Sequence, residues 1–242
     1  MVQTLMLREH AIVLVIPDFK PPALTLEMLH YSGCIPSEWE LVHPPVYTQQ
    51  ATQFRFRNGI CLTAYPERLL FSQEAHTQAL SDSQIASLVH KYVVSFPHAR
   101  YQAVGMNFHG DVAFPQGSDN ARHFITQLLS PGPWQTLGQD PMQASLTCSY
   151  RLDRCQLNLA ISSAMLRVAE EQAVPVVTFA ANFNYSIPGN VLEDRLAQLL
   201  QALTQWQTNL DTYQELVNTR FLVQVNTTVD ASEALVVGAG SC

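Results

Sequence analysis

The stretch Met142–Leu152, MQASLTCSYRL, alternates apolar and polar side chains along its whole length. Side chains on a β-strand point to opposite faces at a period of two, so this stretch predicts a strand with one buried and one polar face. The stretches Cys155–Ser162 and Val176–Ile187 repeat the alternation. The three stretches together predict an antiparallel meander rather than a lone strand.

The polar face of this meander carries almost no charge, whereas solvent-facing sheet surfaces usually carry Lys, Glu and Arg. Small amides and hydroxyls are desolvated at lower cost than charges, so another subunit or protein can cover such a face. A second interpretation is a compositional bias, because the chain has two lysines, Lys20 and Lys91, and glutamine replaces charge elsewhere too. The candidate interface residues are Gln143, Ser145, Thr147, Asn158, Asn182 and Asn184.

A second three-strand meander is predicted nearer the N-terminus. Gln53–Arg57 alternates up to Asn58-Gly59, a pair typical of a type I′ hairpin turn, and two further apolar strands follow. The continuously apolar run Ala11–Ile16 predicts a central strand that is buried on both faces. Tyr101–Phe108 alternates as well and predicts one more strand.

Each meander is followed by a helical pattern. Apolar residues recur at helical spacing over Ile85–Phe96, and a second series runs from Leu192 to Val217 with steps of four and three. The second series predicts one helix of about 40 Å, longer than an ordinary sheet needs for cover. Either the whole apolar seam lies on the protein's own sheet, or part of it packs on a partner helix.

These elements predict an α+β fold, with a mostly antiparallel sheet built from two βββ meanders and with helices packed on one sheet face. Residues 1–225 are expected to form a single domain. Its possible internal duplication would give pseudo-repeat halves 1–115 and 116–225. Residues 226–242 are rich in small side chains and are expected to form a loose tail.

Composition excludes some classes of function. The 242 residues carry a formal net charge of −7, which argues against binding to a phosphate backbone. A basic signal segment and an apolar run long enough to span a bilayer are both lacking, so a cytoplasmic protein is expected. The histidines show no metal-ligand spacing and no nucleotide-binding motif is present, so neither a metal nor a cofactor is expected.

One polar cluster could carry chemistry. His109 and Asp111 are predicted to lie in a loop just past a strand, and Arg122 and His123 lie on the helix that follows. An imidazole, a carboxylate and an arginine can together perform acid–base chemistry on an anionic substrate. The competing interpretation is a solvated loop in which Gly110 makes a turn.

Three stretches, Tyr101–Asn107, Ser130–Trp134 and Asn182–Tyr185, resemble an uncharacterised family of bacterial, mainly cyanobacterial, proteins. The resemblance implies a protein of unassigned role and carries over neither activity nor site residues. The sequence therefore favours a non-enzymatic accessory or interaction protein that binds a protein partner or a second copy through its charge-poor sheet face and long helix. The alternative is an enzyme or small-molecule-binding protein that uses the loop around His109 and Asp111.

Overall fold

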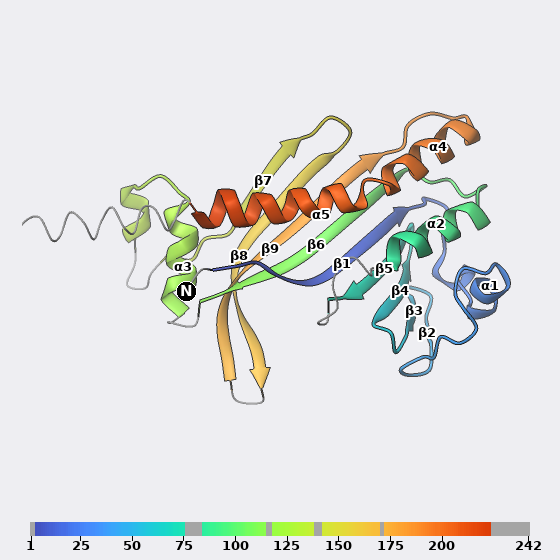
Figure 1. Ribbon diagram of the computed structural model, residues 1–242, viewed down its shortest axis with the longest axis horizontal. Helices are drawn as coiled ribbons and strands as arrows, with labels where there is room; N and C mark the ends of the chain where they lie inside the picture. Colours follow the sequence, from blue (N-terminus) through green and yellow to red (C-terminus); the bar gives the residue numbers. More distant parts are fainter. Residues whose placement is uncertain (1–2, 76–83, 115–117, 138–141, 170–171, 224–242) are drawn as a thin grey trace, which may run out of the picture.

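The computed structural model describes residues 3–75, 84–114, 118–137, 142–169 and 172–223 and has an α+β fold (Figure 1). Among these residues nine strands form one antiparallel sheet, in the order β2-β3-β4-β5-β1-β6-β9-β8-β7. The strands are β1 (Met6–Val15), β2 (Val46–Tyr47), β3 (Thr52–Arg55), β4 (Ile60–Tyr65), β5 (Arg68–Glu74), β6 (Ala103–Ala113), β7 (Leu146–Arg151), β8 (Gln156–Ala169) and β9 (Gln172–Ser186). The helices are α1 (Leu26–Tyr31), α2 (Ile85–Ser95), α3 (Ser118–Gln127), α4 (Leu192–Leu203) and α5 (Trp206–Glu215), with short 3₁₀ turns η1 (Pro21–Ala23) and η3 (Pro133–Thr136).

The two predicted meanders are confirmed, and they lie at opposite ends of the sheet. The first is β3-β4-β5 and the second is β7-β8-β9, while β1 and β6 are antiparallel neighbours at the centre. Each central strand pairs with the last strand of the meander that follows it in the chain, β1 with β5 and β6 with β9. Each half thus runs in the order strand, helix, meander, helix. Internal duplication stays a prediction, and the predicted tail at 226–242 lies outside the described residues.

Strand lengths differ from those expected. β7 begins at Leu146 rather than Met142. β8 and β9 continue past this N-terminal end of β7, where Met165 still pairs with Pro175. Beyond the last pair of β9 with β6, Ala113 with Val176, β8 and β9 continue to pair with each other. The two strands form an arm that projects from the sheet in Figure 1.

The turn at Asn58-Gly59 is not the expected type I′ turn. Gly59 alone has a positive φ, 82°, and its N–H donates to the carbonyl of Phe56. The Phe56 N–H in turn donates to the carbonyl of Ile60, which closes a three-residue loop. This geometry is that of a type I turn followed by a glycine in the left-handed region, a common alternative in hairpins.

The predicted long helix is interrupted. A turn at residues 204–205 separates α4 from α5, and a π-helical segment, η4 (Leu216–Phe221), follows α5. From Leu199 to Val217 the apolar seam is buried within the protein's own core, while Leu192 in the first turn is 38% exposed. The seam therefore faces its own sheet, and the interpretation that it packs on a partner helix is wrong for this buried part. None of the described helices combines the length and apolarity required to cross a membrane.

Candidate functional site

The helices cover one face of the sheet, called here the helix face. Aromatic pairs mark the contacts, with ring centroids 5.6 Å apart for Phe71 of β5 and Tyr92 of α2, and 4.8 Å apart for Phe108 of β6 and Trp206 of α5. Helix α3 packs on β8 and β9 from the same side. Figure 1 shows α2, α4 and α5 lying across the strands. None of these four helices packs on the opposite face, called here the open face.

Strand register places a row of polar side chains across the open face. Asn107 of β6 is paired with Asn182 of β9, which is paired with Asn158 of β8, and Ser149 of β7 follows. The Nδ2 of Asn182 donates to the Oδ1 of Asn107 at 2.5 Å, and the hydroxyl of Ser149 donates to the Oδ1 of Asn158 at 2.7 Å. Side-chain hydrogen bonds thus link both pairs, and each amide orients its neighbour.

Several positions beside this row carry small side chains or none. Gly105 is paired with Val13, and Ala180 is paired with Ala160, which is exposed. A hollow of about 420 Å³ lies over β1, β5, β6 and β9, with Asn107, His109 and Asn182 among its lining residues. The face is therefore low in relief and hollowed at its centre, which is a shape that a folded partner can cover.

Four of the six predicted interface residues lie together on this face: Thr147, Asn158, Asn182 and Asn184. Gln143 and Ser145 are exposed but precede β7, because that strand starts at Leu146. Sequence reasoning missed Asn107, although the same alternation that places Met106 and Phe108 inward places Asn107 on the other face. The charge-poor surface therefore extends one strand further toward the centre than expected.

The predicted loop at His109–Asp111 is wrong, because β6 continues to Ala113 and holds both residues within a strand. Both oxygens of Asp111 are engaged. Its Oδ2 lies 3.1 Å from Nε of Arg8, and its Oδ1 accepts a hydrogen bond of 2.8 Å from the hydroxyl of Thr178. With 7% of its surface exposed, Asp111 ties β6 to the bulged start of β1 and to β9. His109 is exposed beside it on the open face.

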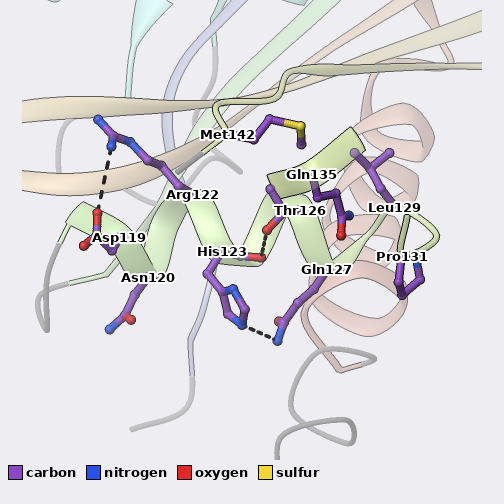
Figure 2. Close-up of a pocket in the computed structure, with 10 residues that line it drawn as sticks. All are labelled: Asp119, Asn120, Arg122, His123, Thr126, Gln127, Leu129, Pro131, Gln135 and Met142. Carbon is purple, nitrogen blue, oxygen red and sulfur yellow. Dashed lines mark hydrogen bonds and ion pairs between the residues drawn. The ribbon is translucent and has the colours of Figure 1, made fainter. Parts of the chain in front are cut away.

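Arg122 and His123 lie on α3, on the other side of the sheet from Asp111. Arg122 forms an ion pair of 3.9 Å with Asp119, and Nε2 of His123 lies 2.8 Å from Nε2 of Gln127. Figure 2 shows the guanidinium of Arg122 and the imidazole of His123 pointing in different directions. Both residues line a pocket of about 780 Å³ between α3 and η3. The four candidate catalytic residues therefore do not form one site.

His10 is a buried titratable group that makes stability depend on pH. It lies on the helix face, 3% exposed, with its ring centroid 5.3 Å from that of Trp206. Burial lowers the pKa of His10 from 6.5 to about 4, and a hydrogen bond with Gln73 opposes this shift only in part. The neutral imidazole is therefore the form that the folded protein holds.

We expect stability to fall as the pH is lowered from 7 toward 4, because the unfolded chain protonates His10 before the folded one does. Between pH 7 and pH 5 this group alone removes about 2 kcal/mol from the free energy of unfolding. Urea unfolding of the wild type and of His10→Gln at both pH values measures the difference. An equal loss in the two proteins would contradict the assignment.

Comparison with known proteins assigns no class. No protein-family model matches the chain, and no curated protein sequence matches it significantly. The similarity to uncharacterised bacterial proteins therefore remains a prediction. Among the described residues, no three His, Cys, Asp or Glu side chains lie together as metal ligands would.

Proposed function

We propose that this is an interaction protein, without catalytic activity of its own, that binds a protein partner through the open face of its sheet. The supporting observation is the row from Asn107 to Ser149, which consists of two hydrogen-bonded side-chain pairs and crosses four adjacent strands on the face that α2–α5 leave free. Solvated surfaces of this size normally carry charges that discourage association. On β8 and β9 the open face carries none between Gln156 and Ser162 or between Thr178 and Asn184.

The energetics of desolvation favour a protein partner over a charged ligand. Burying an amide or hydroxyl that keeps its hydrogen bonds costs far less than burying an unpaired charge. Asn182 and Asn107 already bond to each other, and Asn158 accepts from Ser149 and Gln156, so a partner needs to supply only a few polar groups. The expected partner surface is uncharged, with backbone or amide groups facing this row.

The alternative, an enzyme or small-molecule-binding protein, has less support. Asp111 is held by Arg8 and Thr178 and is almost fully buried, so it is poorly placed to exchange a proton with a substrate. Arg122 and His123 line a different pocket on the helix side. A catalytic role for the predicted set would need these residues in one place.

A charge-insertion experiment tests the proposed surface. The double variant Ala160→Lys, Asn184→Lys places two ammonium groups at exposed positions of the open face. The matched control, Gln201→Lys with Thr208→Lys, places the same charge at exposed positions of α4 and α5. All three proteins are used as bait in native extract, and captured proteins are quantified by mass spectrometry.

We expect the wild type and the control to retain a partner protein. The amount captured by the open-face variant should be at least about tenfold lower, because burying an unpaired charge costs more than 1.4 kcal/mol. Capture of the same proteins by all three baits, or of none by the wild type, would contradict the proposal. Circular dichroism of each variant shows whether the fold is retained.

A further inference from the structure

Among the described residues, strand β7 forms one edge of the sheet. It is the last strand in the sheet order, so it is paired with β8 on one side only. The strand is six residues long, contains no proline or lysine, and pairs with β8 without a bulge. Natural sheets usually protect an edge strand with prolines, lysines or bulges, and β7 has none of these. The opposite edge is protected, because β2 has two residues and directly follows Pro44 and Pro45.

The hydrogen-bonding groups on the free side of β7 can be assigned from the hairpin. The N–H of Leu152 donates to the carbonyl of Cys155, so this pair closes the β7–β8 hairpin. Hydrogen-bonded and non-hydrogen-bonded pairs alternate in an antiparallel ladder. The backbone groups of Cys148 and Tyr150 therefore point toward β8, and those at alternate positions point away from the sheet. The outward set is Thr147, Ser149 and Arg151.

We propose that β7 pairs antiparallel with β7 of a second copy of this chain, about a twofold axis at Ser149. Ser149 then lies opposite the partner's Ser149, and Thr147 lies opposite the partner's Arg151. All of these positions are outward-facing, so each pair exchanges two N–H···O bonds, as a hydrogen-bonded antiparallel pair does. The two nine-stranded sheets become one continuous sheet, and their open faces lie on the same side.

The chemistry of β7 favours a second copy as its occupant because the strand is complementary to itself in this register. On the helix side the half-buried Cys148 meets the partner's Tyr150, and Leu152, which is 37% exposed, meets the partner's Leu146. Arg151 carries the strand's one charge. The two Arg151 positions lie four residues apart along the strands, about 14 Å at 3.4 Å per residue. That separation exceeds the Debye length of about 8 Å at physiological salt, so the repulsion is screened.

Hydrogen exchange of the wild-type protein tests the register without a mutation. Backbone amides of residues 146–152 are followed by NMR at low and high protein concentration, and the oligomeric state is measured by light scattering. The amides of Thr147, Ser149 and Arg151 are expected to slow by at least about tenfold when the dimer forms. The amides of Cys148 and Tyr150 are protected by β8 in both states, so they serve as internal controls.

A proline substitution tests the same edge by mutation. Ser149→Pro removes an outward N–H that β8 does not use, a position where an edge strand tolerates proline. It should raise the dimer dissociation constant at least about 100-fold, through two lost hydrogen bonds and a ring at the axis. Ser149→Thr, a β-former at the same site, should remain dimeric.

Three outcomes would each overturn the proposal. The wild type could be a monomer at all concentrations, or its dimer could have outward amides that exchange as fast as in the monomer. The third outcome is a folded Ser149→Pro protein that still dimerises. If Ser149→Pro does not fold, the wild-type amide pattern decides. Failure of the proposed β7 dimer is distinguishable from failure of the proposed open-face interaction. The open-face lysines at positions 160 and 184 are not at the edge and should leave the dimer intact.

Discussion

Replacing Phe108 by alanine is expected to lower the free energy of unfolding by about 4 kcal/mol, the middle of the range for a buried aromatic residue. Phe108 is 1% exposed at the centre of β6 and joins three parts of the core. Its ring centroid lies 4.8 Å from that of Trp206, 5.8 Å from that of Tyr213 in a stacked arrangement, and 5.8 Å from that of Phe183. Alanine would leave a cavity between the sheet and α5 that these rings cannot fill without moving.

The neighbouring residue provides the matched control. His109 is on the same strand but on the open face, and it is exposed, so His109→Ala is expected to change stability by no more than about 0.5 kcal/mol. Urea unfolding at neutral pH measures both variants, and Phe108→Leu gives an intermediate loss if the alanine variant does not fold. Comparable losses for Phe108→Ala and His109→Ala would contradict the assignment of the two faces.

Periodicity of two was sufficient to predict most of the sheet. The hairpin that joins β7 to β8 has the register that this alternation requires, with Cys148 opposite Leu159, because apolar residues on both strands must share one face. What periodicity cannot supply is the pairing of distant strands. β1 binds β5 on one side and β6 on the other, and these contacts span long stretches of chain. The row from Asn107 to Asn158 likewise depends on the pairing of β6 with the distant strand β9, so it could be predicted only in parts.

The prediction of a loop at His109–Asp111 was wrong because Gly110 was interpreted as a turn. The alternation of β6 continues through Phe108, Gly110 and Val112 on the helix face, with His109 and Asp111 on the open face. Gly110 lacks a side chain to extend the pattern, and a glycine beside an aspartate is typical of a turn. In the structure β1 and β9 hydrogen-bond to β6 past this point, so the tertiary context overrides the local preference.

Gly110 is required because α5 approaches its backbone closely, and not because the chain turns there. A side chain at this position is therefore expected to have a large effect on stability. A Cβ at this position would lie 2.8 Å from Cδ1 of Leu5, 2.9 Å from the carbonyl oxygen of Met6 and 2.9 Å from the hydroxyl of Tyr213. That hydroxyl donates a hydrogen bond of 2.8 Å to the carbonyl of Phe179, so it cannot move without leaving a buried acceptor unpaired. Gly110→Ala is expected to cost about 3 kcal/mol.

Gly105 lies on the same strand and provides the comparison, because its added Cβ would lie 3.1 Å from Nδ2 of Asn182 on the open face. An amide side chain can shift by a few tenths of an ångström where a backbone carbonyl cannot, and alanine also reduces the entropy of the unfolded chain. Gly105→Ala is therefore expected to change stability by less than about 1 kcal/mol. Urea unfolding of both variants checks the contrast. Equal losses would mean that the helix face is no more tightly packed than the open face, and the distinction between a core face and a binding face would fail.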